Sequence, residues 1–291
     1  MDAKSFLFVG LGLVLAIYLV TLVRGGFARP TWFQALVGFV TAFFDTLGIG
    51  SFATTTSIFK LKNLVPVKLM PGTLNVGHTL PTITQAFIYT KIVPVESATL
   101  VLMIVAAVVG SLAGVGVVVR WPRRKIQIGM GLALLVSAAL FLMAQFNVTL
   151  AGGDTLGLTG TRLWIGLAGN FALGVLMMLG IGLYAPCMLL VSLLGMNPTA
   201  AFPIMMGSCA FLMPIASMRF VRTRTYDKRA AWSLALGAVP AVLIAAYLVK
   251  SLPLVYVRWL VIVVVVYTSI NMLMTARQQD TTHGFAGAGV A

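Results

Sequence analysis

The sequence predicts an all-α polytopic membrane protein built from two inverted-topology repeats. Each repeat is expected to contain a re-entrant broken-helix hairpin followed by three spanning helices, and one extra N-terminal helix precedes the first repeat. Three observations predict this fold: the apolar composition, an internal repeat, and the distribution of Lys and Arg among the loops.

The composition indicates a single transmembrane domain over residues 1–291. Of the 291 residues, 60% are hydrophobic and 9% are charged, which excludes an ordinary soluble domain. Apolar runs near the roughly 20 residues that cross about 30 Å of hydrocarbon recur along the chain. We therefore expect a multi-pass protein of the cell membrane, meaning an inner or plasma membrane. Nine apolar segments can be drawn, at 5–24, 31–63, 66–90, 95–119, 126–145, 162–194, 198–218, 230–250 and 255–276.

An internal repeat relates the two halves of the chain. Residues 32–71 align without a gap to residues 164–203, and both copies contain Leu-Gly-Ile-Gly, at 47–50 and 179–182. Membrane transporters are commonly built from such paired repeats, so the repeat favours a secondary transporter over an enzyme. Other shared positions are Trp32/Trp164, Phe39/Phe171, Ala53/Ala185, Pro66/Pro198 and Pro71/Pro203. The expected units are an N-terminal helix at 1–30, repeat 1 at 31–145, repeat 2 at 162–276 and a flexible tail at 277–291.

The basic residues decide between two ways of threading the chain. If every segment crossed the membrane, the basic loops 120–125 and 219–229 would lie on opposite sides, against the positive-inside rule. If the overlong segments 31–63 and 162–194 instead enter, break at their glycines and return, these loops share one side. That side is expected to be cytoplasmic, with the N-terminus outside and the C-terminus inside. It receives Arg24, Arg29, Lys60, Lys62, Lys68, Arg120, Arg123, Arg124, Lys125, Arg219, Arg222, Arg224, Lys228, Arg229 and Arg277.

The outer side keeps fewer basic residues, namely Lys4, Lys91, Arg162, Lys250 and Arg258. Each repeat then makes an odd number of crossings, so the second repeat is upside down relative to the first. The net charge of +14 belongs to short loops rather than to one helical face. It therefore indicates contact with anionic membrane lipids, and we expect no nucleic-acid partner.

The two broken segments predict an anion site. Non-helical backbone cannot face lipid, so each break is expected to line a protein-enclosed or watery cavity. New helices are expected to begin near Ser51 and Leu183, where unpaired N–H groups and the helix dipole favour anions. No Lys or Arg lies near the centre of a spanning segment. A small anionic substrate is therefore expected to bind backbone N–H groups and hydroxyls.

The candidate substrate-binding residues come from both hairpin tips and from the helices that follow them. The spacing of Asn75, His78, Thr79 and Thr82 predicts one polar helical face, which is expected to face a cavity or another helix. We expect repeat 1 to supply polar ligands and repeat 2 to supply an apolar wall and a second helix end. The full set is Gly48, Ile49, Gly50, Ser51, Thr54, Thr55, Asn75, His78, Thr79, Thr82, Gly180, Gly182, Tyr184 and Ser208.

Two ionisable residues are candidates for coupling proton movement to substrate movement. Asp45 is the carboxylate next to a predicted tip, and His78 is the imidazole within the membrane segments. Asp45 could equally cap a half-helix, and His78 could equally bond a neighbouring carbonyl group.

No catalytic or metal-binding motif is found. Cys187 and Cys209 lie in apolar segments without metal-ligand spacing and are interpreted as buried small side chains. His-Glu-x-x-His, Gly-x-Ser-x-Gly and Gly-x-x-x-x-Gly-Lys-Ser/Thr are absent. The protein is therefore expected not to be an enzyme and to use no cofactor, metal or ATP.

Four stretches carry a family resemblance: Asp-Thr-Leu-Gly-Ile-Gly at 45–50, Pro-Gly-Thr-Leu-Asn-Val-Gly-His at 71–78, Leu-Gly-Ile-Gly-Leu-Tyr-Ala-Pro at 179–186 and Phe-Pro-Ile-Met-Met-Gly-Ser-Cys at 202–209. They resemble the TauE/SafE family of membrane permeases, which are described as exporters of sulfite or organosulfonates. The resemblance covers the chain from about Thr31 to Met274. It implies transport of a small sulfur-containing oxyanion, such as sulfite, sulfoacetate or a related sulfonate.

Two alternatives for the function stay open at this point, and so does the oligomeric state. The same architecture could form an anion channel, or it could carry a different small organic anion. Gly110 and Gly114 have the G-x-x-x-G spacing of close helix contacts, either within the chain or in a homo-oligomer.

Overall fold

The computed structural model describes residues 3–146, 153–180 and 182–248, with 259, 262–263, 266–267, 269–270 and 273–274. The predicted tail at 277–291 and most of the segment at 255–276 lie outside these residues. Of the described chain, 81% is helical and none forms a strand. The prediction of an all-α protein is therefore confirmed.

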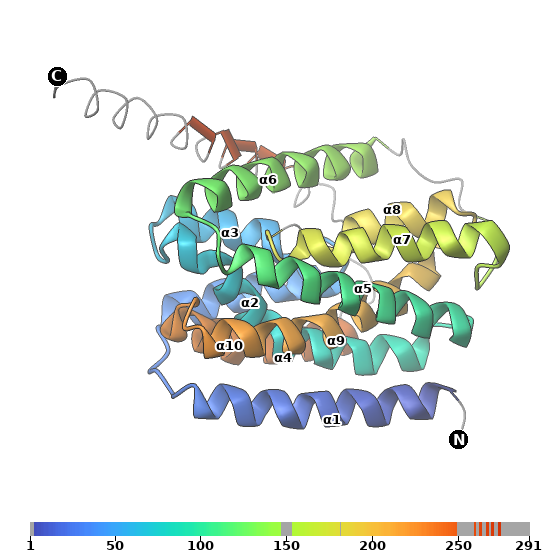
Figure 1. The fold of residues 1–291 in the computed structure, drawn as a ribbon, viewed down its shortest axis with the longest axis horizontal. Coiled ribbons are helices and arrows are strands. Elements are labelled where there is room, and N and C mark those ends of the chain that lie inside the picture. The colour runs from blue at the N-terminus through green and yellow to red at the C-terminus, as the bar shows by residue number, and fades with distance from the viewer. Residues whose placement is uncertain are drawn as a thin grey trace, which may run out of the picture.

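The helices lie roughly along one common direction (Figure 1). They are α1 (Ala3–Arg24), α2 (Trp32–Thr46), α3 (Ser51–Leu61), η1 (Val67–Leu69), α4 (Met70–Ile92), α5 (Ser97–Val118), α6 (Arg123–Gln145), α7 (Gly160–Met177), α8 (Tyr184–Leu193), η2 (Pro198–Ala200), α9 (Ala201–Arg222) and α10 (Lys228–Leu248).

Four described helices are long and apolar enough to cross a membrane, which makes this a membrane protein. They comprise most of α1 (from Ser5), α5, α9 and most of α10 (to Tyr247). Helix α4 has 23 residues and is also long enough to cross, but it carries the predicted polar face. The expected total of seven spanning helices stays a prediction.

The order of elements repeats along the chain. A helix pair, a short 3₁₀ turn and two long helices occur as α2, α3, η1, α4 and α5, and again as α7, α8, η2, α9 and α10. Adding 132 (the offset from Trp32 to Trp164) to the bounds of the first set gives the bounds of the second set to within a few residues.

Each short helix pair is an antiparallel hairpin. In the first, Asp45 of α2 contacts Ser51 of α3 and Thr41 contacts Thr55, as antiparallel pairing requires. The 15 residues of α2 span about 22 Å, which is less than the roughly 30 Å of a hydrocarbon core. In Figure 1 the α2–α3 hairpin enters from the end of the bundle where α1 finishes, and the α7–α8 hairpin enters from the opposite end.

Glycines allow the hairpins to pack closely against long helices of the other half. Helix α2 lies along α10 and α7 lies along α5. Side chains added at Gly110 and Gly114 of α5 would meet the backbone carbonyls of Phe171 and Val175 in α7. The G-x-x-x-G pair is thus used for contact within the chain.

Substitution Gly110→Ala should destabilise the protein by about 1–3 kcal/mol, because the added methyl group overpacks the α5–α7 contact. Gly12→Ala is the control, since nothing lies within 4 Å of a Cβ at that helical position. Thermal unfolding in detergent should show a lower midpoint for Gly110→Ala and an equal or higher one for Gly12→Ala. Equal midpoints for Gly110→Ala and the wild type would contradict the close contact.

Helix α5 begins at a carboxylate cap outside the apolar span. Glu96 accepts hydrogen bonds from the backbone N–H groups of Ala98 (3.0 Å) and Thr99 (2.7 Å). Hydrogen bonding to Thr99, and in smaller part to Ala98, outweighs partial desolvation and lowers the pKa of Glu96. The cap therefore stabilises the fold above the ordinary glutamate pKa of about 4.3, and its contribution is lost as pH falls through the lowered value.

Substitution Glu96→Ala should reduce stability by about 1 kcal/mol at neutral pH, the usual effect of removing an N-cap. The difference between the variant and the wild type should shrink as the pH is lowered through the lowered pKa. Unfolding midpoints measured at several pH values test this, and a difference that stays constant into acid would contradict it.

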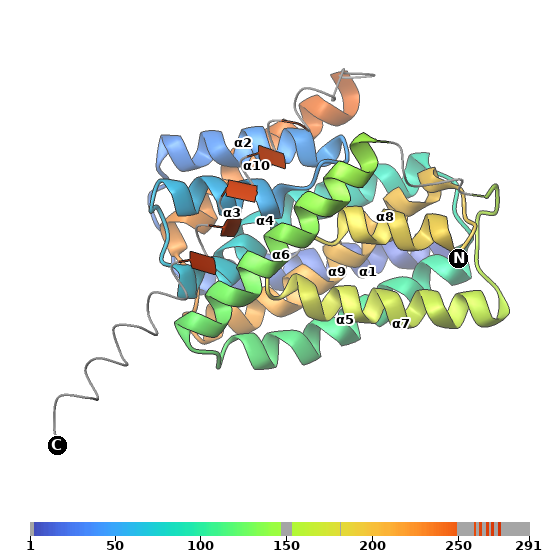
Figure 2. The same ribbon diagram turned by 90° about the horizontal axis from the view of Figure 1, so that it is seen from above.

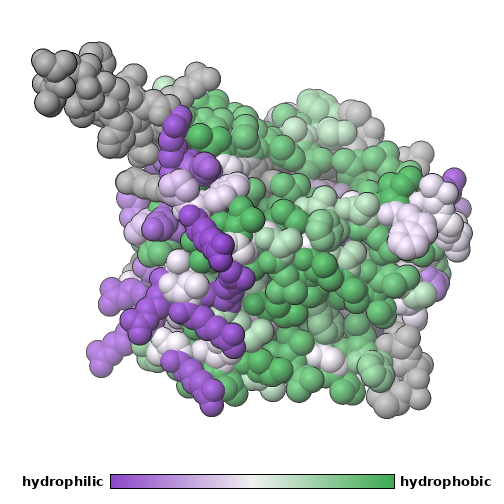
Figure 3. All heavy atoms as spheres, in the orientation of Figure 1, coloured by the Kyte–Doolittle hydropathy of each residue, from purple (hydrophilic) through white to green (hydrophobic). Residues whose placement is uncertain are grey.

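Polar residues gather at one end of the bundle. Figure 3 shows the hydrophilic side chains at the end where α1 finishes and α10 begins. There Lys228 lies beside Gly26, and Arg219 lies beside Gly116. The basic loops that were expected on one side are therefore neighbours, while their assignment to the cytoplasm stays a prediction.

Helix α6 crosses the other helices obliquely (Figure 2).

Candidate functional site

The two hairpin turns meet inside the bundle and both line a small cavity, here called the central cavity. Its volume is about 10 Å³, roughly the space that one water molecule needs. The turns and the helix residues next to them supply most of its lining, and α4 and α9 complete it. The lining residues are Asp45, Gly50, Ser51, Phe52, Thr82, Met177, Gly182, Leu183, Tyr184, Cys209 and Met213.

The first turn, residues 47–50, ends α2 and starts α3 at the predicted place. Gly48 N–H donates to Asp45 O (2.9 Å) and Ile49 N–H donates to Phe44 O (3.0 Å), which is the Schellman pattern of a helix end. Gly48 and Gly50 have φ of +93° and +84°, which side-chain-bearing residues rarely adopt. The glycines therefore reverse the chain between the two arms of the hairpin.

The second turn repeats part of this geometry. Gly180 has φ of +94° and its N–H donates to Met177 O (3.0 Å). The following helix begins at Tyr184, one residue after the expected start at Leu183. Ile181 of this turn lies outside the described residues. Both turns thus place the first residues of a helix, Ser51 or Tyr184, in the wall of the central cavity.

The Asp45 carboxylate caps α3. Its Oδ1 accepts a hydrogen bond from Ser51 N–H (2.6 Å), the first residue of the helix. Its Oδ2 accepts one from Gln85 Nε2 (2.9 Å), and the side chain is 5% exposed. The interpretation of Asp45 as a helix cap, left open by the sequence, is therefore correct in this structure.

Gln85 of α4 connects the two turns. Its Nε2 donates to Asp45 Oδ2 and to Thr46 Oγ1 (2.9 Å), and its Oε1 accepts from the Tyr184 hydroxyl (2.6 Å). One amide side chain thus bonds to residues of α2 and to the start of α8. Gln85 was not among the predicted site residues, although it lies three positions after Thr82 and seven after His78, on the same helical face.

The predicted polar face of α4 is buried, but its residues point to different neighbours. Thr82 lines the central cavity. His78 Nε2 lies 3.0 Å from Thr55 Oγ1, and Thr79 Oγ1 lies 3.3 Å from Ser217 Oγ of α9. Asn75 Nδ2 donates to Pro71 O (2.9 Å). Of these four predicted site residues, the structure brings only Thr82 to the central cavity, and the others face neighbouring helices or their own helix.

The other predicted residues lie around the turns rather than in the cavity wall. Thr54 Oγ1 donates to Ser51 O (2.9 Å), and Ser208 Oγ accepts from Asn170 Nδ2 (3.0 Å). Gly48 lies near Phe202, and Gly180 lies near Met130. Gly48, Ile49, Thr54, Thr55, Asn75, His78, Thr79, Gly180 and Ser208 are outside the lining, and their binding role stays a prediction.

The wall is chemically divided as the sequence suggested. The α2–α4 part supplies the carboxylate and hydroxyls of Asp45, Ser51 and Thr82. The α7–α9 part supplies apolar residues such as Met177 and Met213, with the Tyr184 hydroxyl as its polar exception. Sequence reasoning could not single out Met177, Cys209 and Met213, because many apolar residues fit the same pattern.

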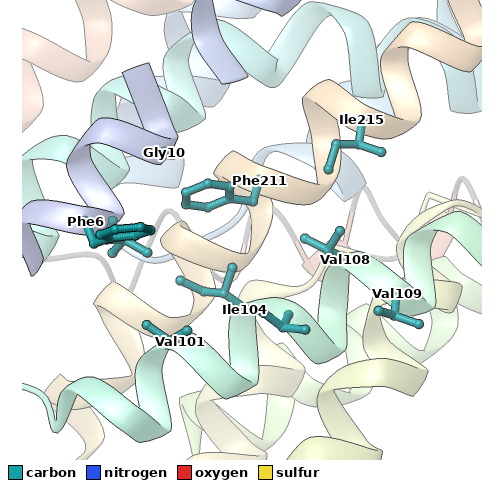
Figure 4. Close-up of a pocket in the computed structure, with 10 residues that line it drawn as sticks. Phe6, Gly10, Val101, Ile104, Val108, Val109, Phe211 and Ile215 are labelled. Carbon is teal, nitrogen blue, oxygen red and sulfur yellow. The ribbon is translucent and has the colours of Figure 1, made fainter. Parts of the chain in front are cut away.

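A larger hollow lies at the surface between α1, α5 and α9 (Figure 4). It measures about 690 Å³, and its lining side chains, including Phe6, Ile104 and Phe211, are apolar. It offers no side-chain donor for an anion and is not a candidate anion site. In the described part of the chain no three His, Cys, Asp or Glu side chains gather as metal ligands would.

The chain matches no protein-family model and no curated protein. Its resemblance to the TauE/SafE permeases therefore stays a prediction made from the quoted motifs.

Proposed function

We propose that the protein is a secondary carrier of a small anion in the cell membrane, and that the anion binds between the two hairpin turns. One observation carries the proposal: the N-terminal ends of α3 and α8, which belong to hairpins entering from opposite ends of the bundle, line the same buried cavity.

The chemistry of this cavity suits an anion. The first N–H groups of a helix have no intrahelical acceptor, and the dipole places partial positive charge there. Helix α8 brings the backbone N–H groups of Tyr184 and Ala185 but none from Pro186, so α3 is the richer donor. The hydroxyls of Ser51 and Thr82 add side-chain donors, while the Tyr184 O–H donates to Gln85 Oε1. Several weak donors in place of a lysine or arginine give the modest affinity that a carrier needs to release its substrate.

The size of the cavity supports alternating access. A sulfur oxyanion cannot fit into a space of about 10 Å³, so the two turns have to separate before it enters. Because the hairpins reach the cavity from opposite ends, moving either one opens a path to its own end. We infer that the two ends are the two membrane faces, that the repeats have inverted topology, and that the basic end is cytoplasmic.

The substrate class follows from the resemblance to the TauE/SafE permeases. Sulfite, sulfoacetate and related sulfonates present several oxygen acceptors to converging N–H and O–H donors. An anion channel of the same architecture, or a carrier of another small organic anion, are the alternatives. The small volume of the cavity favours a carrier, since a channel needs a continuous open path.

Uptake of labelled sulfite and sulfoacetate into proteoliposomes tests the proposal. The expected result is uptake that saturates with concentration. Uptake that does not saturate would favour the channel, and no uptake of either compound would overturn the sulfur-oxyanion assignment.

A further inference from the structure

The position that an anion would take at the start of α3 is already held by a negatively charged group of the protein. Asp45 Oδ1 accepts the Ser51 N–H hydrogen bond at 2.6 Å, and Asp45 and Ser51 both line the central cavity. An incoming anion that uses the Ser51 N–H must therefore replace this carboxylate or lie directly beside it.

Among the described residues, no cation lies in the cavity wall to reduce the repulsion between Asp45 and an anion. The ionisable groups that face Asp45 are Tyr89 of α4, Tyr184 of α8 and Cys209 of α9, and none of them carries positive charge. His78 is directed to Thr55 and is outside the lining. Two negative charges that share such a buried site cannot both persist, so one of them must gain a proton.

We propose that Asp45 is the coupling group of the carrier, and that an anion binds at α3 only when Asp45 takes up one proton from the solution. This inference rests on the proposed function. The proton forms an O–H bond with the Asp45 carboxylate, which frees the Ser51 N–H for the anion. Release of the anion returns the proton to the solution on that side. One proton therefore moves with each anion and in the same direction.

Gln85 keeps the neutral form of Asp45 in place. It contacts Asp45 Oδ2 through its Nε2, and its Oε1 is an acceptor on the same side chain. A protonated Asp45 can keep Oδ2 as the acceptor for Gln85 Nε2 and carry its O–H on Oδ1, where it can donate to the bound anion. The anion then meets a neutral acid, hydroxyls and two helix ends.

The test is binding of sulfoacetate to the purified protein by calorimetry, from roughly pH 6 to roughly pH 8, where both acidic groups of this probe are ionised. The wild type should bind more tightly as the pH falls, by up to about tenfold per unit, with up to one proton taken up per anion. Asp45→Asn keeps a side-chain acceptor for Ser51 N–H but has no charge. Its affinity should be independent of pH, with no proton uptake.

Asp227→Asn is the matched control. Asp227 also caps a helix, accepting from Ala230 N–H (2.8 Å), but it lies outside the central cavity. This variant should keep the wild-type pH dependence. The same pH dependence in Asp45→Asn as in the wild type would overturn the inference.

If Asp45→Asn does not fold, the binding measurements on the wild type are enough to test the coupling. Wild-type affinity that does not change with pH, or binding without proton uptake, would overturn the coupling while the carrier stands. Failure of both sulfite and sulfoacetate to bind or to be taken up would overturn the sulfur-oxyanion assignment, and the coupling of a proton to these anions with it.

Discussion

Gly50→Ala should reduce anion uptake by roughly tenfold or more while the protein still folds. Gly50 has φ of +84° and ψ of 133°, a backbone conformation open essentially to glycine alone. An alanine there costs about 1–3 kcal/mol of strain, and about 1.4 kcal/mol is a factor of ten in rate. The strain falls on the residue before Ser51, so relaxation turns the Ser51 N–H away from Asp45 and from the cavity.

The added methyl group would contact no neighbouring atom, so any effect of Gly50→Ala comes from the backbone conformation rather than from a steric clash. Nothing lies within 4 Å of a Cβ built at Gly50, and the same holds at Gly160, where φ is +56° and α7 begins. Gly160→Ala therefore places an alanine at another glycine with positive φ, away from the central cavity. Uptake per folded molecule should fall for Gly50→Ala and not for Gly160→Ala. Equal uptake by both variants would show that the geometry of the first turn has no part in transport.

Gln85→Leu should destabilise the protein by roughly 3 kcal/mol or more. The leucine side chain resembles glutamine in size but removes the hydrogen bonds to Asp45, Thr46 and Tyr184 at once. Each buried polar group that loses its partner costs about 1–3 kcal/mol. Thermal unfolding in detergent should show the loss of stability, and uptake by the folded fraction should fall because the two turns are no longer linked.

A pair of tyrosine variants separates the stability effect from the transport effect. Tyr184→Phe removes the hydroxyl that donates to Gln85 in the cavity wall. Tyr18→Phe removes an equally buried hydroxyl, which donates to Val76 O (2.7 Å) between α1 and α4. Both should lower the unfolding midpoint, but only Tyr184→Phe should lower uptake. Normal uptake by Tyr184→Phe would contradict the role of the Gln85 connection.

The hairpins were predictable because glycine leaves a local signal. A Leu-Gly-Ile-Gly motif that occurs twice at one offset, inside segments too long for one crossing, indicates a chain reversal. The start of α3 at Ser51 is confirmed, and α8 begins one residue later than expected. These features depend on the backbone conformation of a few adjacent residues, and the glycines among those residues indicate that conformation in the sequence.

The members of the cavity wall were less predictable because they depend on packing. Helical spacing places Asn75, His78, Thr79 and Thr82 on one face, but α4 is buried on nearly all sides. Small differences in angle then direct these side chains to α3, to α9 or to the cavity. The same geometry brings in Gln85 from the end of that face, and no pattern in the sequence distinguishes it from its neighbours.

The central claim is that the transported anion binds between the two turns, and a native cysteine allows a direct measurement. Cys209 lines the central cavity, whereas Cys187 is buried in α8 outside the lining. In a Cys187→Ala variant, a small neutral thiosulfonate should modify Cys209 when the turns separate. Sulfoacetate, which does not consume the reagent, should slow this modification in a concentration-dependent way.

The reciprocal variant, Cys209→Ala, reports on Cys187 and should show no such protection. Protection of Cys209 alone, at the concentrations that half-saturate uptake, is the result that the proposed site predicts. Modification of Cys209 at an unchanged rate, in a protein that still takes up sulfoacetate, would place the anion elsewhere and contradict it.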